Sequence, residues 1–291
     1  MKPGNTKLIR LTRIEEKYNL NNFIYAKLEN SNPSGSIKDR AVYQMLIDYQ
    51  KESRLNSNTT IIEATSGNTG ISLGYYKNEF DYKLVIVMPE SMSKERREMI
   101  SNYGAELVLT KGGMQESKNY AVELVKKTKN SILFDQFNNK SNVLGHYKTT
   151  GPEIIEEMPE IDYLFAGIGT GGTITGTGKY LKEKSNCKII GVEPEESPLL
   201  TKGVSGPHLI QGIGANFVPP LLDKNVVDEI VDIKGKNAEI CAKSLRNLEQ
   251  IDIGLSSGAA LEACIKYIKE NKISGKNIVL IFPDKGDRYK W

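Results

Sequence analysis

The sequence predicts an α/β protein with mainly parallel sheets that are covered by helices. Short runs of β-branched and aliphatic residues alternate along the chain with longer helix-like segments, an order typical of parallel strands joined through helices. Two turns rich in glycine and hydroxyl side chains each connect such a run to a helix-like segment, and open α/β sheets bind ligands at these connections. The expected strands are residues 23–29, 60–62, 84–88, 106–109, 163–166, 188–192 and 277–282.

The composition excludes several classes of protein. The chain has 291 residues, enough for one large core or two coupled ones. Its 39 basic and 36 acidic side chains give a net charge of +3, which is too small and too evenly spread to indicate nucleic-acid binding. No apolar run approaches the length of a membrane span, and the first residues lack the profile of a signal peptide. We therefore expect neither a nucleic-acid partner nor a membrane location.

The three cysteines, Cys187, Cys241 and Cys264, are widely spaced. They form no Cys-x-x-Cys pair, so neither a disulfide scaffold nor a zinc site follows, and we expect no metal. This cysteine usage indicates a reducing, cytoplasmic location. Cys241 and Cys264 fall in helix-like patterns, where we expect them to be small core residues.

Lys38 is the first candidate catalytic residue. It lies in the segment Asn-Pro-Ser-Gly-Ser-Ile-Lys-Asp-Arg at residues 32–40, where turn-forming residues separate the strand at 23–29 from a helix-like segment. The partial positive charge of a helix N-terminus disfavours an ammonium group, so we expect the pKa of Lys38 to be lowered. A deprotonated lysine is what Schiff-base chemistry requires. Taken alone, the segment is also compatible with a solvated helix start.

A second candidate segment, Glu-Ala-Thr-Ser-Gly-Asn-Thr-Gly at residues 63–70, directly follows the strand at 60–62. Its glycines let the backbone approach a ligand closely. Its N–H and O–H donors would converge on an anion where the next helix begins. The same residue types are favoured helix caps, so a tight turn without a ligand explains this segment alone equally well.

A third segment is the glycine-rich loop at residues 167–178, between the strand at 163–166 and a helix-like segment. Its spacing partly matches a dinucleotide-binding loop, but no acidic residue about 20 positions on ends a second strand cleanly. Nor does it end in the Gly-Lys-Ser/Thr of a nucleoside triphosphate loop. What remains is a donor-rich cup for one phosphate at a helix N-terminus. An amine nucleophile, a carboxylate-binding turn and a monophosphate cup together describe a pyridoxal phosphate site.

With these motifs the chain resembles the cysteine synthase (O-acetylserine sulfhydrylase) and cystathionine β-synthase family, which are fold type II pyridoxal phosphate enzymes. The resemblance extends over nearly the whole chain. Besides the three segments above, it rests on residues 4–11, 88–97, 146–154, 191–194, 211–215 and 256–260.

The resemblance implies a tryptophan synthase β-like fold with two open, mainly parallel sheets and the cofactor between two domains. The large cofactor-binding domain would comprise residues 1–35 and 146–291, with the opening residues crossing over to join it. Residues 36–145 would form a small mobile domain that closes over the substrate. The family also implies a homodimer, and serine acetyltransferase is a candidate partner.

The resemblance assigns roles around the cofactor, pyridoxal 5′-phosphate. Lys38 would form the Schiff base and then act as acid and base at the substrate α-carbon. Asn68 would hydrogen-bond the 3′-oxygen of the ring, and Ser256 would face the ring nitrogen. A hydroxyl partner provides no charge that holds this nitrogen protonated, which favours α,β-elimination over transamination. The residues expected to hold the phosphate are Gly169, Thr170, Gly171, Gly172 and Thr173.

The substrate α-carboxylate would be bound by the turn after residue 62. Carboxylate binding there would close the small domain and exclude water from the reacting groups. Gln136 is expected to help, although it could also be an exposed loop amide. Gly212 and Ala215 suggest a pocket for a compact substrate. The turn residues expected to contact the carboxylate are Thr65, Ser66 and Thr69.

The implied reaction is a β-replacement that forms L-cysteine from O-acetylserine and sulfide through an aminoacrylate intermediate. The chain leaves no room for the regulatory repeat of a full-size cystathionine β-synthase. Residues 211–217 are closer to the sulfhydrylase pattern, but Asn216 replaces a glycine and is nearer in shape to the β-synthase aspartate. Lys7 replaces a family proline. Residues 133–139 and 287–289, the latter ending at Tyr289, are similar to the second, thiosulfate-tolerant cysteine synthase type.

Several alternatives therefore stay open. A cysteine-consuming reaction that releases hydrogen sulfide is one, and cystathionine β-synthase activity is another. A catalytically silent relative that acts as a regulatory partner is the non-enzymatic alternative, although Lys38 and the phosphate cup are both intact. We expect structural roles for His146 and His208, because Lys38 already supplies the proton transfer.

Overall fold

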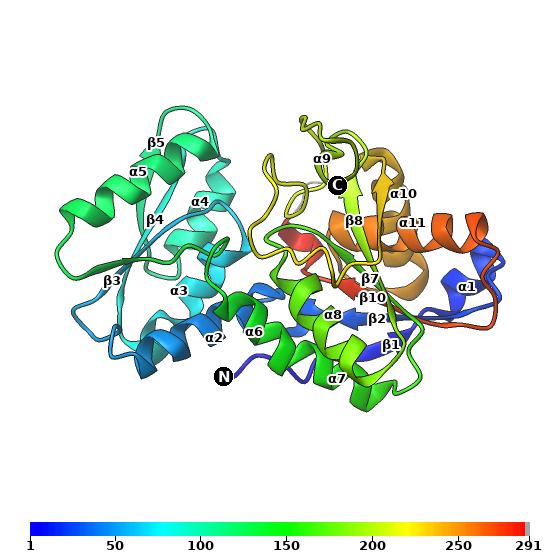
Figure 1. Ribbon diagram of the computed structural model, residues 1–291. Helices are drawn as coiled ribbons and strands as arrows, with labels where there is room; N and C mark the ends of the chain where they lie inside the picture. Colours follow the sequence, from blue (N-terminus) through cyan, green and yellow to red (C-terminus); the bar gives the residue numbers. More distant parts are fainter. Residues whose placement is uncertain (289–291) are drawn as a thin grey trace.

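Two separate sheets organise the chain, one in each of two lobes (Figure 1). The computed structural model describes residues 1–288, except for the side chains of Glu95 and Arg96, so Tyr289 lies outside the described residues. One sheet has the strand order β1-β2-β10-β7-β8-β9 and the other β5-β4-β3-β6. Within the described chain, all pairings between the named strands are parallel except the antiparallel pair β1–β2, and an isolated antiparallel bridge joins Ser36 to Asp284. The predicted α/β fold class is confirmed.

The strands in the middle of the larger sheet read as continuous apolar runs because helices cover both of their faces. Each of the strand runs expected from the sequence forms a strand, with bounds that differ by at most two residues. The larger sheet comprises β1 (Leu8–Arg10), β2 (Phe23–Leu28), β7 (Tyr163–Gly167), β8 (Lys188–Pro194), β9 (Glu229–Ile233) and β10 (Asn277–Phe282). The smaller sheet comprises β3 (Thr60–Ala64), β4 (Lys83–Pro89), β5 (Glu106–Thr110) and β6 (Ser131–Leu133).

The helices alternate with these strands, as parallel connections require. In the smaller lobe α5 packs on β3 and β4, and in the larger lobe α11 packs on β7 and β10. The helices are α1 (Thr12–Tyr18), α2 (Lys38–Lys51), α3 (Asn68–Phe80), α4 (Lys94–Ser101), α5 (Met114–Lys127), α6 (Ser141–Lys148), α7 (Thr150–Glu157), α8 (Gly172–Lys184), α9 (Leu199–Lys202), α10 (Gly235–Glu249) and α11 (Leu255–Glu270), with 3-10 turns at η1 (Glu29–Ser31) and η2 (Gly286–Arg288).

Helix α6 lies between α2 and α8 and contacts both. Glycines allow these close approaches. A Cβ atom on Gly145 of α6 would come within 2.7 Å of the Arg40 carbonyl oxygen in α2, and one on Gly176 of α8 within 2.2 Å of the Val143 carbonyl oxygen in α6. Helix α6 thereby packs closely against both the helix that begins with Lys38 and the helix that follows the glycine-rich loop.

Each lobe has its own apolar core. Residues such as Met45, Ile61 and Ile86 form a cluster on the smaller sheet, and separate clusters cover the faces of the larger one. Cys241 and Cys264 are buried in the core of the larger lobe, as predicted, and burial raises the pKa of both thiols. No helix among the described residues is long and apolar enough to span a bilayer.

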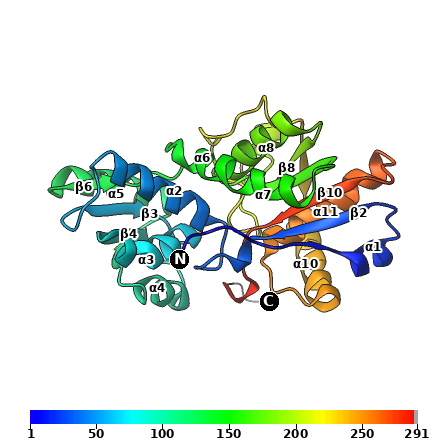
Figure 2. The same ribbon diagram turned by 90° about the horizontal axis from the view of Figure 1, so that it is seen from below.

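A cluster of buried charges fixes the N-terminal segment, which crosses from the smaller lobe to the larger sheet (Figure 2). The Arg40 guanidinium donates to both carboxylate oxygens of Glu29 at 2.6 and 2.7 Å and to those of Glu153 at 2.7 Å. Lys27, with a fully buried side chain, lies 3.1 Å from Glu153 and donates to the Thr6 carbonyl oxygen at 2.6 Å. The charges are paired and hydrogen-bonded, as burial of ions requires. Arg40 lies two residues after Lys38 in α2, so this cluster anchors the start of the helix that carries Lys38.

Candidate active site

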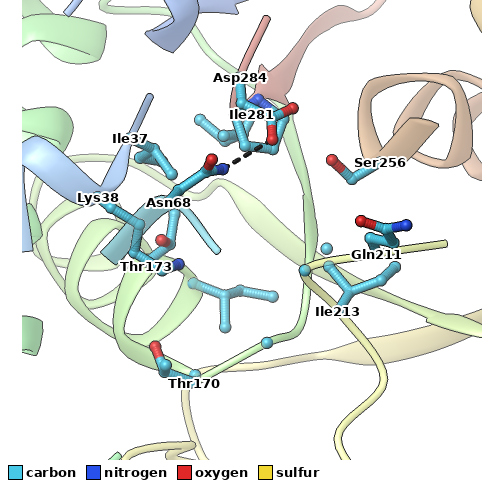
Figure 3. A pocket seen from close by; sticks show the side chains of 16 residues that line it. Ile37, Lys38, Asn68, Thr170, Thr173, Gln211, Ile213, Ser256, Ile281 and Asp284 are labelled. Atoms are coloured by element: carbon cyan, nitrogen blue, oxygen red, sulfur yellow. Dashed lines mark hydrogen bonds between the residues drawn. The ribbon is translucent and has the colours of Figure 1, made fainter. Parts of the chain in front are cut away.

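One pocket brings together residues from all three of the segments singled out in the sequence (Figure 3). Its lining includes Lys38, Asn68 and parts of the glycine-rich loop, with Ser256 and Asp284 from the larger lobe. Residues more than 200 positions apart therefore share one cavity. Of the predicted site residues, those in its lining are Lys38, Asn68, Gly169, Thr170, Gly171, Thr173, Gly212 and Ser256.

Lys38 is the first residue of α2, and its side chain extends into the pocket (Figure 3). Burial lowers the pKa of its ammonium group, while the carboxylate of Asp284 opposes this shift. The predicted direction is therefore correct. The main cause is loss of solvent, which the sequence could not reveal, rather than the helix N-terminus alone. A larger fraction of neutral amine makes Lys38 a better nucleophile and base.

The glycine-rich loop turns sharply into α8. Gly171 precedes the helix with a φ of +83°, a conformation that favours glycine. A Cβ atom there would come within 2.7 Å of the Leu222 nitrogen, and one on Gly172 within 2.1 Å of the Asn142 Oδ1 atom. The Thr170 hydroxyl oxygen accepts from the Gly172 N–H at 3.3 Å and from Asn142 Nδ2 at 3.1 Å. The backbone N–H groups at the start of this helix can receive a phosphate.

His146 supports this loop from α6. Its Nε2 atom lies 3.2 Å from the Thr173 hydroxyl, and its Nδ1 atom lies 3.0 Å from the Thr150 hydroxyl. Burial holds the pKa of His146 well below its usual range, and the positive charges of Arg40 and Lys38 lower it further. The ring is therefore neutral and orients Thr173. In the second histidine, His208, the Nε2 atom bonds to the Gly214 carbonyl oxygen at 3.0 Å.

Asn68 begins α3 and faces the pocket with a fixed amide. Its Nδ2 atom donates to Asp284 at 2.7 Å, and Arg288 donates to its Oδ1 atom. A guanidinium can only donate and a carboxylate can only accept, so these partners determine which way the amide points. Asp284 was missed as a site residue in the sequence. Its position just after the parallel strand β10 is the signal that could have found it.

The predicted carboxylate-binding residues lie at the turn between β3 and α3. The Thr69 hydroxyl donates to Gln136 Oε1 at 2.7 Å, and the Thr65 hydroxyl accepts from the Gly67 N–H at 3.2 Å. Gln136 is only 8% exposed, so the alternative of an exposed loop amide is wrong. Of the residues in this turn, Asn68 belongs to the described lining of the Lys38 pocket. The predicted residues outside that lining are Thr65, Ser66, Thr69, Gln136, Gly172 and Ala215.

Ser256 is the second residue of α11 and faces the pocket from the side opposite Lys38 (Figure 3). It is 4% exposed, and its hydroxyl is a neutral hydrogen-bonding group. An amine on one side, a hydroxyl on the other and a donor-rich helix N-terminus below them fit the aldehyde, ring nitrogen and phosphate of pyridoxal phosphate. Among the described residues, no group of three or more metal-ligating side chains is placed to hold a metal ion.

Comparison with known proteins agrees with this geometry. The family model described as pyridoxal-phosphate dependent enzyme matches residues 1–284. The cysteine synthase of Buchnera aphidicola subsp. Schizaphis graminum is 46% identical over 299 residues, which cover 98% of this chain and 91% of that protein. The chain belongs to the cysteine synthase and cystathionine β-synthase family. It is thus a pyridoxal phosphate-dependent enzyme.

Two further members of this family are similar over nearly their whole length. Cysteine synthase B of Campylobacter jejuni is 45% identical over 290 residues, which cover 98% of this chain and 94% of that protein. The crystal structure of a hydrogen sulfide-producing enzyme from Fusobacterium nucleatum has a TM-score of 0.93 and 41% identity, with 99% of this chain and 97% of that chain covered. The predicted resemblance, fold and cofactor are confirmed.

Proposed function

We propose that this enzyme forms L-cysteine from O-acetylserine and sulfide by β-replacement. The observation that carries the proposal is the pocket in which the Lys38 amine faces the Ser256 hydroxyl across the expected cofactor position. Two cysteine synthases at 45% and 46% identity support the choice of substrates. A neutral partner at the ring nitrogen favours elimination and replacement at the β-carbon over transamination.

Pyridoxal phosphate, when bound, supplies an electron-withdrawing ring that stabilises negative charge at the substrate α-carbon. Lys38 takes the proton from that carbon and later returns it, which its lowered pKa allows. The N–H groups around Gly171 and the Thr170 and Thr173 hydroxyls hold the phosphate. Asn68 orients the ring through its fixed amide.

The remaining predicted residues act on the substrate. Acetate leaves from the β-carbon, and sulfide adds to the same carbon. Gly212 leaves space for this compact amino acid, because no atom beyond its own residue and its chain neighbours lies within 4 Å of a Cβ atom built on it. We assign Ala215, which lies outside the described lining of the pocket, to the same role on membership of the family. The α-carboxylate is received by Gln136 and by the turn that contains Thr65, Ser66 and Thr69.

We further propose that residues 36–145 form the small domain and move against residues 1–35 and 146–291. All strands of the smaller sheet fall within residues 60–133 and have their own core, which supports these boundaries. A homodimer, a cytoplasmic location and docking of serine acetyltransferase belong to the same proposal and rest on membership of the family.

A cysteine-consuming reaction that releases hydrogen sulfide is the second candidate. The similarity to the hydrogen sulfide-producing enzyme of Fusobacterium nucleatum favours it. Asn216, the substitution closest to the cystathionine β-synthase pattern, is exposed and lies outside the described lining of the pocket. The structure therefore assigns Asn216 no role in the pocket. Lys7 is also exposed, and its backbone oxygen accepts from the Leu28 N–H at 2.9 Å.

The test is a product analysis under matched conditions with three substrate sets. These are O-acetylserine with sulfide, L-cysteine alone, and L-serine with homocysteine. We expect the first set to give the highest kcat/KM. A higher value for L-cysteine alone would establish the hydrogen sulfide-releasing reaction instead. A higher value for L-serine with homocysteine would establish cystathionine formation, while the assignment of Lys38 would stand in every case.

A further inference from the structure

Glu63 is a buried carboxylate next to the proposed substrate turn that the mechanism above does not use. It lies near the end of β3, an inner strand of the smaller sheet, and is 4% exposed. Its Oε1 atom accepts from Gln136 Nε2 at 2.9 Å, and its Oε2 atom accepts from the Asp135 N–H at 2.9 Å. A buried acidic group needs such partners, and here one of them is the side chain proposed to bind substrate.

These bonds fix the orientation of the Gln136 amide. A carboxylate accepts hydrogen bonds only, so the amide must turn its nitrogen towards Glu63 and its oxygen towards the Thr69 hydroxyl, which donates at 2.7 Å. One of the two N–H groups of Gln136 is then used by Glu63. The described residues provide no acceptor for the other, which is left to a ligand.

The backbone of Gln136 is also held. Its carbonyl oxygen accepts from Asn142 Nδ2 at 2.9 Å, and the same amide group of Asn142 donates to the Thr170 hydroxyl at 3.1 Å. The side chain and the main chain of Gln136 are thus both tied, one to β3 and the other to the phosphate loop. Only the free N–H remains available for recognition.

We propose that Glu63 is a positioning residue that aims Gln136 at the α-carboxylate of the amino-acid substrate. The inference rests on the proposed function, in which an amino acid is bound at this turn. Glu63 acts through Gln136 and contacts no substrate itself. A carboxylate here has a second, opposing effect on an incoming anion, because like charges repel. The positive charge of Lys118, which faces Glu63 and Asp135, reduces that repulsion.

The test uses Glu63→Gln, which keeps the size of the side chain but replaces one acceptor by a donor. The backbone N–H of Asp135 still needs an acceptor, so the new amide keeps its oxygen there and turns its nitrogen towards Gln136. Gln136 then turns its oxygen towards position 63, and its N–H groups face Thr69 instead. We would measure the dissociation constant of L-alanine, which has no β-leaving group, from the visible absorption of the bound cofactor in the holoenzyme at pH 8. Because burial raises the pKa of Glu63 to about 7, the wild-type group is ionised at this pH.

We expect Glu63→Gln to weaken L-alanine binding about tenfold, the size of one charge-assisted hydrogen bond. The affinity for pyridoxal phosphate should stay unchanged, and KM for O-acetylserine should rise while kcat does not. In a double-mutant cycle, Glu63→Gln should have no further effect on L-alanine binding when Gln136→Ala is already present, because both substitutions remove the same interaction. Asp135→Asn is the matched control. It removes a neighbouring carboxylate but keeps the backbone N–H group that donates a hydrogen bond to Glu63.

Additive effects in this cycle would show that Glu63 does not act through Gln136 and would overturn the inference. Tighter binding of L-alanine by Glu63→Gln would overturn it as well, because repulsion would then outweigh positioning. Should Glu63→Gln fail to fold, Glu63→Asp provides the same cycle, since it withdraws the carboxylate by one methylene. Wild-type enzyme that holds the cofactor but binds no amino acid would overturn the proposed function itself.

Discussion

The two turns that approach the active site begin alike and are held in different ways. Each follows a parallel strand, and each has a glycine before the first residue of its helix, Gly67 for α3 and Gly171 for α8. Beyond its own residue and its chain neighbours, no atom lies within 4 Å of a Cβ atom built on Gly67. At Gly171 the backbone has a positive φ, and a Cβ atom would contact Leu222 at 2.7 Å.

This difference indicates what each glycine is for. At the start of α8, glycine is required by the protein itself, because the chain around Leu222 packs against Gly171 and Asn142 of helix α6 packs against Gly172. At the start of α3 the protein leaves space open beside Gly67, and hydrogen bonds from Thr69 to Gln136 and from Gln136 to Glu63 hold the side chains instead. We infer that the cofactor half of the site is preformed by packing, while the substrate half is shaped by polar contacts.

Lys38 lies between these two turns, and its loss should have the largest effect. Lys38→Ala should lower kcat by about a thousandfold or more, because nucleophile and acid-base catalyst are lost together. The cofactor should still be held by the phosphate turn, without a covalent bond. Steady-state kinetics with a dialysis assay for cofactor would check this, and Lys7→Ala, at an exposed position, is the matched control. Retention of more than about a tenth of wild-type kcat would contradict the assignment.

The hydrogen-bonded turn before α3, which Glu63 supports, can be tested through the pH dependence of stability. The folded-state pKa of Glu63 is raised from 4.5 to about 7 by burial, so the folded enzyme binds this proton more tightly than the unfolded chain. Its contribution to stability is complete below about pH 4.5 and is lost as the pH rises to about 7, a change of roughly 3 kcal/mol. Urea unfolding at pH 5 and pH 8 should therefore show a smaller loss of stability in Glu63→Gln than in the wild type. Equal losses of stability in the two proteins would show that the pKa of Glu63 is not raised in the folded enzyme.

A pair of matched substitutions tests the packed turn against the open one. Gly172→Ala should lower the free energy of unfolding by about 1–3 kcal/mol, because its methyl group overlaps the Asn142 side chain. Cofactor affinity should fall with it. Gly67→Ala should leave stability within about 0.5 kcal/mol and cofactor affinity unchanged, while amino-acid binding weakens. Similar cofactor affinities in the two variants would remove the distinction between the turns.

The smallest effect is expected at Ser256. Ser256→Ala should keep the cofactor and most of the activity, because a neutral hydrogen bond contributes about 0.5–1.5 kcal/mol. Ser256→Asp should stabilise a protonated ring nitrogen and change the visible spectrum of the substrate-bound enzyme. Spectra of the two variants with O-acetylserine would decide, and no difference between them would place the ring nitrogen away from Ser256.

The sequence predicted most of the strands because each is a local run of apolar residues. The runs at residues 163–166 and 277–282 form adjacent strands, and the loop after the first becomes the start of α8. The short strands β1, β6 and β9 were missed, since each has few apolar residues and depends on its neighbours for pairing.

Parts of the site were also beyond local reasoning. Asp284 and Arg288 reach Asn68 from the other end of the chain, and only the tertiary fold brings them together. Glu63 stood within a recognised motif but received no role, because neither its burial nor its bond to Gln136 has a sequence signal. His146 was expected to have a structural role, and its hydrogen bond with the Thr173 hydroxyl shows what that role is.

The most direct test of the account is to identify the lysine that carries the cofactor. Borohydride reduction of the holoenzyme fixes pyridoxal phosphate covalently to its lysine, and peptide mapping by mass spectrometry locates it. We predict a single modified residue, Lys38, whose side chain lies in the pocket between the two turns and whose pKa is lowered by burial. Modification of Lys118 or any other lysine, with Lys38 unmodified, would contradict it.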